Sequence, residues 1–269
     1  CVRDGTPLVA GRADDPYVGR FLDDKYRIEA FISAGGMGSV YRAQHVMLGK
    51  TVAVKVIKNE LVTSDEIVTR FQREARAASN LDHPNIVTVY DLGQTADGTL
   101  YIAMEFIDGP SLREAIRRDG PMPAGRAVDI LRQVASALSA AHRRQIVHRD
   151  LKSHNLMLAA DDDGRDVVKL VDFGIAKTFD ESTQLTAAGY MMGTPHYMSP
   201  EQAFGEPIDH RADIWSLGII AYRCLSGVLP TQGENLGQIL KVLMKSEIRP
   251  LRELSPDLPP ILLDLVDRM

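Results

Sequence analysis

The polar stretch 148–155 gathers several side chains that could do chemistry together, and it follows an apolar pair at 146–147. It reads His-Arg-Asp-Leu-Lys-Ser-His-Asn. In a loop of this kind Asp150 can accept a proton from a hydroxyl, Lys152 can neutralise a phosphoryl group in transfer, and Asn155 can offer an amide oxygen to a hard cation. A solvated basic loop is the plain alternative. The stretch alone therefore leaves the choice open.

A second oxygen ligand is available at Asp172, which ends the apolar run 167–171 and precedes Phe173 and Gly174. If Asp172 lies near Asn155, its carboxylate gives magnesium two oxygen ligands from the protein while the ion is held against a triphosphate. The tripeptide Asp-Phe-Gly is common and carries little weight by itself. It needs a nucleotide cradle elsewhere in the chain.

A glycine-rich turn between two predicted strands is the candidate cradle. The strands are expected at 26–32 and 39–43, and Gly35, Gly36 and Gly38 lie between them. Glycines let backbone N–H groups approach phosphate oxygens closely. A turn of this composition is more often only a hairpin, so it too needs support from other residues.

The run 51–57 predicts a β-branched strand with Lys55 in its middle, on the same face as Ala53. A lysine on a buried strand needs an anionic partner. The next segment predicts a helix that starts with a capping box at 63–66 and carries Glu74 on its apolar stripe. Lys55 and Glu74 would compensate each other and present an ammonium group to ATP phosphates. A solvated lysine and an unrelated glutamate at the rim are the weaker alternative.

Two further apolar runs, 85–92 and 99–106, complete an antiparallel sheet of about five strands. The turn residues at 108–110 then break the pattern and indicate a hinge between two lobes. Backbone groups just before this break, those of Glu105 and Ile107, could meet the edge of an adenine ring, with Met104 behind them.

Beyond the hinge, apolar residues recur at helical spacing. One stripe covers 127–141, and the longest apolar run, 217–229, predicts a buried helix that Asp213 opens and in which Asp213 supports polar backbone. Later helices are expected at 236–244 and 261–266. The predicted fold is α+β and bilobal, with a loosely ordered lead-in at 1–25, an N-terminal lobe at 26–107 with a five-stranded antiparallel sheet and one main helix, and a mostly helical C-terminal lobe at 108–269.

The composition is that of a globular protein, because 45% of the 269 residues are hydrophobic and 25% are charged. A net charge of −5 gives no electrostatic reason to expect nucleic acid or an anionic membrane as the main partner. Cys1 and Cys224 are too few for a disulfide framework or a zinc cluster, so we expect a reducing, cytoplasmic compartment. Because the chain starts at Cys1 and ends at Met269 inside a helical pattern, we expect both ends to be cut.

In order and spacing these stretches resemble the signature motifs of the eukaryotic-like, or Hanks-type, protein kinase family over residues 26–269. The resemblance is to the serine/threonine branch, because of Lys152 in the loop and the Gly-Thr-Pro segment at 193–195. The turn at 35–41 and the Ser-Pro-Glu-Gln segment at 199–202 are most similar to bacterial members. The resemblance implies a protein kinase-like fold and the catalytic domain of a bacterial serine/threonine protein kinase.

The resemblance also implies a role for each matching residue. The catalytic set is Asp150, Lys152, Lys55 and Glu74. The magnesium ligands are Asn155 and Asp172. The ATP-binding residues are Ile32, Gly35, Gly36, Gly38, Val40, Ala53, Lys55, Met104, Glu105, Ile107 and Met157.

Control and substrate binding follow from the same resemblance. Similar kinases are switched on when a phosphothreonine of the activation loop pairs with the arginine that matches Arg149. Thr186 is the first candidate for that phosphothreonine and Thr183 the second. Thr194 and Glu201 would belong to the platform that holds the substrate peptide. That the loop threonines are merely solvated residues remains the alternative.

The function implied is transfer of the γ-phosphoryl group of ATP to serine or threonine hydroxyls of proteins, with Mg²⁺ or else Mn²⁺, in signal transduction. A homodimer would allow autophosphorylation in trans, and a longer protein would supply any membrane tether. This fragment needs neither membrane nor nucleic acid. A pseudokinase that acts as a scaffold or nucleotide sensor is the alternative, against which the intact set of charged residues argues. A small-molecule phosphotransferase is disfavoured, because a small acceptor needs no peptide platform.

Three positions depart from the family pattern. Ser33 stands where the first glycine of the turn is usual, and Ser153 stands where a proline is usual. The arginine that pairs with the residue matching Glu201 has no counterpart up to Met269. These departures leave the expected phosphate-binding glycines and the expected base in place.

Overall fold

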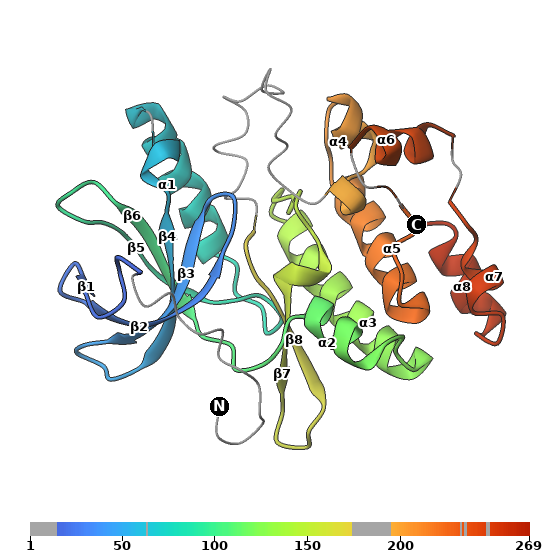
Figure 1. Ribbon diagram of the computed structural model, residues 1–269, viewed down its shortest axis with the longest axis horizontal. Coiled ribbons are helices and arrows are strands. Elements are labelled where there is room, and N and C mark those ends of the chain that lie inside the picture. Colours follow the sequence, from blue (N-terminus) through green and yellow to red (C-terminus); the bar gives the residue numbers. More distant parts are fainter. Residues whose placement is uncertain (1–14, 63, 174–194, 232, 234–235, 246–247) are drawn as a thin grey trace. The chain divides into compact units, whose positions relative to one another are not determined.

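The computed structural model describes residues 15–62, 64–173, 195–231, 233, 236–245 and 248–269 (Figure 1). The chain divides into two compact units, with one boundary between Ile107 and Asp108. Within the described residues, the first unit consists of 15–80 and 87–107, and the second of 81–86, 108–173 and 195–269. The short segment 81–86 therefore leaves the first unit and belongs to the second.

The first unit is built on a six-stranded antiparallel sheet in the order β1-β2-β3-β4-β6-β5. Its strands are β1 Phe21–Leu22, β2 Tyr26–Ala34, β3 Gly38–His45, β4 Thr51–Ile57, β5 Val89–Gln94 and β6 Leu100–Glu105. The five expected strands are β2 to β6. The expectation of a loosely ordered lead-in is wrong for its last residues, because Asp23 and Asp24 adopt a φ of 54° and fold β1 back onto β2.

β5 begins later than the predicted strand 85–92, because the first residues of that run bind elsewhere. Asn85 Nδ2 donates to the Val168 carbonyl oxygen at 3.0 Å, and Ile86 forms a parallel bridge with Leu170. Both contacts are made within the second unit. Asn85 and Ile86 therefore bind residues of the second unit, and the strand of the sheet begins after them.

One face of the sheet carries a closed apolar core. Its buried members include Val52, Val54, Val56, Tyr26, Tyr41 and Tyr101. The Tyr26 hydroxyl donates to Asp91 at 3.3 Å, and the Tyr101 hydroxyl donates to Asp23 at 3.1 Å. Burial, assisted by the Asp91 carboxylate, raises the pKa of Tyr26 to about 12. The hydroxyls of these core tyrosines are therefore kept protonated and paired with carboxylates.

The main helix of the first unit is α1, Asp65–Ser79, which contacts β5 (Figure 1). Ser64 is its N-cap and accepts a hydrogen bond from Ile67 N at 3.4 Å. The expected capping box at 63–66 is therefore wrong, because the cap lies one residue later and Ile67 has no side-chain acceptor to return the bond. Phe71 is 1% exposed, as the apolar stripe predicts.

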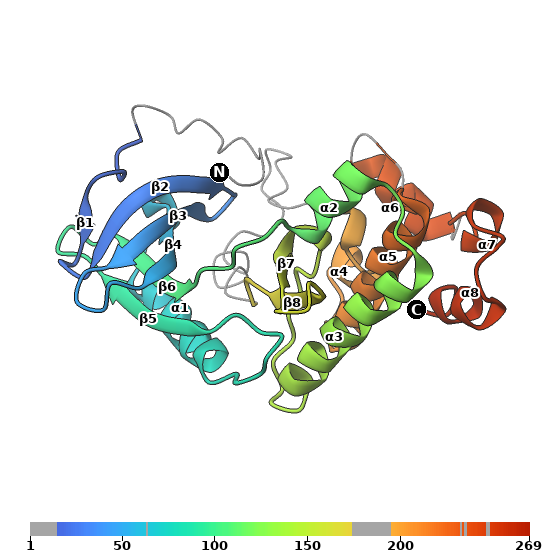
Figure 2. The same cartoon turned by 90° about the horizontal axis from the view of Figure 1, so that it is seen from below.

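The second unit is mostly helical and contains one hairpin, β7 Leu156–Ala160 and β8 Asp166–Leu170 (Figure 2). Its helices are α2 Leu112–Asp119, α3 Ala124–His142, α4 Pro200–Phe204, α5 Arg211–Ser226, α6 Leu236–Lys245, α7 Leu251–Leu254 and α8 Pro260–Val266. Short 3-10 turns occur at η2 Ser153–Asn155 and η4 Pro195–Tyr197, and in the first unit at η1 Asn59–Leu61. α3 packs against both α5 and β8. The four predicted helices are present with shifted ends, and α2, α4 and α7 are additions.

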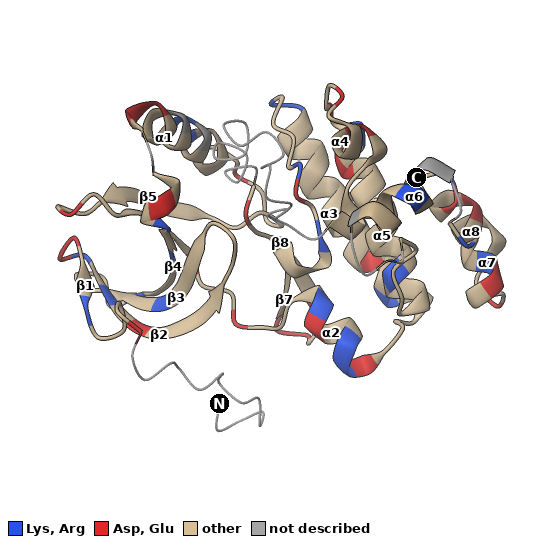
Figure 3. Ribbon diagram, turned by 45° about the horizontal axis from the view of Figure 1, so that its top comes forward, with Lys and Arg blue, Asp and Glu red and all other residues tan. Residues whose placement is uncertain are grey.

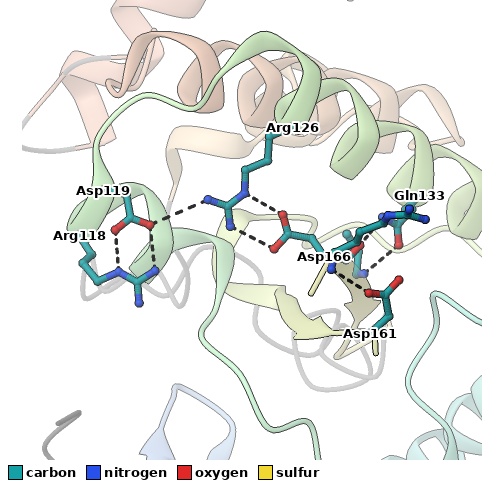
Figure 4. A network of polar contacts seen from close by, with 8 residues as sticks. Arg118, Asp119, Arg126, Gln133, Asp161 and Asp166 are labelled. Carbon is teal, nitrogen blue, oxygen red and sulfur yellow. Dashed lines mark hydrogen bonds and ion pairs between the residues drawn. The ribbon is translucent and has the colours of Figure 1, made fainter. Parts of the chain in front are cut away.

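A polar network fixes the hairpin to α3 (Figure 4). The Arg126 guanidinium binds the Asp166 carboxylate through two hydrogen bonds, at 2.7 and 3.0 Å. Gln133 donates to the Asp166 carbonyl oxygen at 2.9 Å and accepts from Val168 N at 2.9 Å. The Gln133 oxygen also accepts from Asn85 Nδ2 at 2.8 Å. One helix side chain therefore positions both β8 and the segment that precedes β5.

Charged residues of both signs are spread over the helices of the second unit (Figure 3). On α2, for example, Arg118 forms an ion pair with Asp119 at 2.7 Å. Exposed pairs of this kind contribute little to stability. In the described part of the chain, no helix combines the length and the apolar character needed to cross a bilayer.

Gly109 packs against β7 without room for a side chain, since a Cβ there would lie 1.9 Å from the Leu158 carbonyl oxygen. We expect Gly109→Ala to lower the free energy of unfolding by roughly 1–3 kcal/mol, because overpacking forces the backbone apart. Gly125→Ala is the control: nothing lies within 4 Å of its Cβ position, and alanine favours the helix. Urea unfolding measures both variants. Equal stability of the two would contradict the packing argument.

Candidate functional site

Strand register places the predicted nucleotide-binding residues of the first unit on one sheet face. Lys55 is directly opposite Val40 on β3 and Ile102 on β6, and Ala53 is opposite Met104. Directly paired residues share a face, and side chains alternate along a strand. This face is therefore the reverse of the one that carries the valine and tyrosine core. Ala53 and Met104 are each 7% exposed, and Lys55 is half-buried.

The glycines of the β2–β3 turn are required for two different reasons. A Cβ at Gly38 would lie 2.0 Å from the Val56 carbonyl oxygen, so the approach of β3 to β4 itself demands glycine. A Cβ at Gly35 would meet nothing closer than the Gly38 oxygen at 4.0 Å. The chain therefore gives no steric reason for glycine at Gly35. Close approach of a ligand remains as a reason for it, and Gly36 is exposed in the same bend.

The remaining nucleotide-site residues of the first unit are placed less simply. Ile32 is 40% exposed and lies at an irregularity in the β2–β3 pairing. The Glu105 backbone N–H already donates to the Thr88 carbonyl oxygen at 2.8 Å, so only its carbonyl could serve an adenine ring. Ile107 follows β6 and is half-buried. The side chain of Glu74 lies outside those described, so its pairing with Lys55 remains a prediction.

In the second unit, a buried carboxylate holds the backbone of the polar stretch. Asp213 Oδ2 accepts from His148 N at 2.8 Å, and Asp213 Oδ1 accepts from Arg149 N at 2.8 Å. His142 Nε2 lies 2.7 Å from Asp213 Oδ2. The prediction that Asp213 supports polar backbone is confirmed by these bonds. Asp150 thus begins its loop from two residues that are fixed to α5.

The pKa of Asp213 is below its ordinary value of 3.8. Burial is the largest single influence and favours the neutral acid. The hydrogen bond to His142, the electrostatic influence of His148 and the backbone N–H groups together outweigh burial. The stabilisation from this carboxylate is therefore complete above the ordinary pKa, and it is lost as the pH falls through the lowered one.

Asp150, Lys152 and Asn155 form one cluster. Lys152 Nζ donates to Asp150 Oδ2 at 2.6 Å, and Asn155 Nδ2 donates to the Asp150 carbonyl oxygen at 3.0 Å. The Asp150 side chain is 38% exposed and the Lys152 side chain 21%. The Asn155 amide nitrogen therefore forms a hydrogen bond within the loop, and the amide oxygen points away from the Asp150 carbonyl.

Asp172 is joined to this loop through the backbone. Val171 N donates to the Asn155 carbonyl oxygen at 2.9 Å, which brings the start of the Asp-Phe-Gly segment beside the loop. Asp172 has a φ of 60° and Arg149 a φ of 65°, conformations that non-glycine residues adopt at a cost of roughly 1–3 kcal/mol. Two residues with predicted roles thus adopt strained backbone, as often occurs at functional sites.

His148 links the two segments from inside the unit. It is 0% exposed, its Nδ1 accepts from Asp150 N at 3.3 Å, and its Nε2 lies 3.2 Å from the Val171 carbonyl oxygen. Because Nδ1 accepts, Nε2 carries the proton and donates it to that carbonyl. The ring also contacts Phe173, with centroids 4.9 Å apart. His148 is therefore a positioning residue, and Phe173 is buried beside it.

Arg149 presents an unsatisfied donor. Its Nε is buried and has no hydrogen-bond partner among the described residues. Its carbonyl oxygen accepts from Gln202 Nε2 of α4 at 2.7 Å. Thr183, Thr186 and Thr194 lie outside the described residues. Their predicted roles are therefore untested, although the predicted receptor for their phosphate has a free donor.

The segment around the predicted platform residue Glu201 forms regular structure, with η4 followed by α4. Ser199 caps α4 and forms a reciprocal box with Gln202, while Glu201 is half-buried in the first turn. Met157 lies on β7 opposite Lys169 and is also half-buried. The polar Ser199 and Gln202 pair in the Ser-Pro-Glu-Gln segment could have predicted this short helix.

A three-residue cluster beside the loop was not predicted. Ser153 Oγ lies 2.8 Å from Tyr197 Oη. Arg223 Nη1 donates to Tyr197 Oη at 2.7 Å and to Ser153 Oγ at 3.2 Å. In the sequence these residues lie far apart, and only the departure at Ser153 indicated an unusual position.

Comparison with known proteins gives a consistent result. The model of a family described as protein kinase domain matches residues 26–269. Serine/threonine-protein kinase pkn3 of Myxococcus xanthus is 47% identical over 224 residues, which is 82% of this chain and 41% of that protein. Serine/threonine-protein kinase PrkC of Bacillus subtilis is 38% identical over 242 residues, covering 90% of this chain and 36% of that protein. Serine/threonine-protein kinase PknA of Mycobacterium tuberculosis is 39% identical over 256 residues, covering 94% of this chain and 58% of that protein. The chain thus spans less than two thirds of the length of each of these relatives.

The substitution Asp213→Asn tests whether the Asp213 carboxylate holds the backbone of the 148–155 stretch. We expect it to lower the free energy of unfolding by about 3–5 kcal/mol, because an amide cannot replace a buried charged acceptor of three hydrogen bonds. Hydrogen exchange of the His148 and Arg149 amides should accelerate. Asp209→Asn is the control, since among the described residues the exposed Arg211 is the ion-pair partner of Asp209. Unchanged exchange in Asp213→Asn would show that these bonds do not hold the loop.

Proposed function

The chain belongs to the protein kinase family, and from this premise we propose that it is a serine/threonine protein kinase that transfers the γ-phosphoryl group of ATP to protein hydroxyls. The observation that carries the proposal is the Asp150, Lys152 and Asn155 cluster, attached to a buried carboxylate and joined to Asp172. That several relatives are named serine/threonine-protein kinases supports the branch. A structural loop has no need of a base, a cation and two oxygen ligands together.

Asp150 is assigned as the base that accepts the proton of the acceptor hydroxyl. Its carboxylate is accessible, and its orientation is held by the 2.6 Å contact with Lys152 Nζ. Lys152 would then also face the phosphoryl group in transfer and offset its charge. Both residues follow the strained Arg149, whose backbone is bound by Asp213. The bonds to Asp213 therefore determine the position of the Asp150 carboxylate.

The nucleotide is assigned to the first unit. Val40, Ala53 and Met104 give an apolar surface of small and flexible side chains on one sheet face. The open position at Gly35 and the exposed Gly36 leave backbone N–H groups for phosphates, while Gly38 keeps β3 close to β4. Other proposed contacts are Ile32, Lys55 with Glu74, the Glu105 carbonyl, Ile107 and, from the second unit, Met157.

A hard divalent cation fits the donor set of Asn155 and Asp172. An amide oxygen and a carboxylate are oxygen ligands of the kind that Mg²⁺ and Mn²⁺ prefer. The hydrogen bond from Asn155 Nδ2 to the Asp150 carbonyl leaves the amide oxygen for the ion. A bound ion would neutralise charge that develops on the phosphates. Asn155 and Asp172 would hold it, and the Val171 bond keeps the two residues together.

Regulation by phosphorylation of the activation loop is proposed on one observation. The buried Nε of Arg149 has no partner among the described residues, and a phosphothreonine could supply its acceptor. Thr186 remains the first candidate and Thr183 the second, while Thr194 and Glu201 remain assigned to the peptide platform. Whether the longer protein is tethered to a membrane, or dimerises for phosphorylation in trans, also remains a proposal.

Asp150→Asn tests the activity. We expect phosphate transfer from ATP to a generic basic protein to fall by roughly 10²–10⁴-fold, as for a positioned proton acceptor. Affinity for ATP should change little, because Asp150 is assigned to the hydroxyl. Asp162→Asn, in the exposed turn of the hairpin, is the control. No transfer by the wild type would favour the pseudokinase, and loss of ATP binding in the variant would make Asp150 a metal or folding residue.

The switch is tested with Thr183→Ala, Thr186→Ala and their double variant. Mass spectrometry of the protein after incubation with ATP should find phosphate on Thr186 or Thr183. Activity of the double variant should fall several-fold, because the one to three charge-assisted hydrogen bonds from Arg149 are lost. Full activity of the double variant, or a loop without phosphate in an active protein, would refute the switch.

A further inference from the structure

Among the described residues, Arg223 on α5 is held by two neutral acceptors. Its Nη1 donates to the hydroxyl oxygens of Tyr197 and Ser153, and its buried Nε has no hydrogen-bond partner there. In the part of the chain that the structure describes, no carboxylate pairs with this guanidinium. Lys152, the neighbouring cation, is in contrast neutralised by Asp150 at 2.6 Å. Within the described residues, the cluster therefore contains one positive charge without a counter-ion.

A purely structural role does not account for this arrangement. Two hydroxyl oxygens could be joined by a neutral amide or by each other, since Ser153 Oγ already lies 2.8 Å from Tyr197 Oη. Placing a cation in a half-buried position without an anionic partner is unfavourable. An arginine has five N–H donors in a fixed fork, and two acceptors leave most of them unused. The unused donors suit a planar carboxylate or a phosphate.

The position of Arg223 connects it to the acceptor. It binds Ser153, which is three residues after Asp150 in the same loop, and a three-residue segment spans at most roughly 10 Å. A substrate whose hydroxyl lies at Asp150 would therefore bring its next few residues within reach of Arg223. Tyr197, the other acceptor, lies in the sequence between Thr194 and Glu201, the two predicted platform residues.

We propose that Arg223 is a specificity-determining residue that binds an acidic group of the substrate protein, within about three residues of the phosphorylated serine or threonine. The inference rests on the proposed kinase function and names its substrate class. The group is anionic, either a carboxylate of Asp or Glu or a phosphate already present on the substrate. Ser153 and Tyr197 position the guanidinium through its Nη1 and leave the other donors for this anion.

Peptides with one acceptor serine in an alanine background test the proposal. Asp, phosphoserine or Lys is placed at each flanking position in turn, and kcat/KM is measured with ATP. At one position near the acceptor, Asp should exceed Ala by roughly tenfold, the factor that corresponds to 1.4 kcal/mol, and Lys should fall below Ala. A larger gain with phosphoserine than with Asp would identify phosphate as the preferred anion. The preference should weaken with added salt, because exposed charges are screened.

Substitutions at Arg223 separate this role from a structural one. Arg223→Lys should keep the order Asp above Lys at the selected position, and Arg223→Glu should reverse it, since its carboxylate can accept from the Ser153 and Tyr197 hydroxyls. Arg132→Gln removes one positive charge from an exposed position on α3 and should keep the wild-type order. A wild type that prefers no acidic position, or Arg223→Glu with the wild-type order, would overturn the inference. Failure of the wild type to phosphorylate any peptide would instead overturn the kinase proposal.

Discussion

The second unit depends on one buried carboxylate. Asp213 is the only described acidic side chain that accepts two successive backbone N–H groups of the 148–155 stretch, and it also binds His142. Without these bonds Arg149 would have no reason to keep a φ of 65°, and the direction of Asp150 would not be determined. Burial makes the arrangement specific, since an unpaired charge inside α5 would be costly.

The first unit depends on strand register in a comparable way. Alternation along β4 separates Val54, which is 0% exposed in the core, from Lys55 on the opposite face. A slip of one residue between β3 and β4 would exchange these faces and bring lysine into the tyrosine core. Gly38 prevents such a slip, because only a residue without a Cβ fits against the Val56 carbonyl. Gly38 was expected to bind phosphate, but the packing of β3 against β4 already requires a glycine at this position.

Local patterns in the sequence were sufficient for most of the fold and for the support that Asp213 gives to the 148–155 loop. β4 was predicted with its observed ends, because its residues are β-branched and its neighbours break the pattern. α2 could have been predicted from Ser111 and Glu114, which form a reciprocal cap. β1 and the start of β5 could not, since they depend on turns at positive φ and on a distant partner for Asn85. Contacts between remote segments leave no local signal.

The substitution at Ser153 shows why such contacts matter for function. A proline, usual at this position in similar kinases, has no hydroxyl and could neither pair with Tyr197 nor accept from Arg223. Serine at this position therefore also affects α5, because its hydroxyl helps to hold the Arg223 guanidinium beside the 148–155 loop. Serine and arginine make sense together, since the arginine would lose an acceptor without the serine. We therefore interpret the departure at Ser153 as one half of a pair whose other half is Arg223.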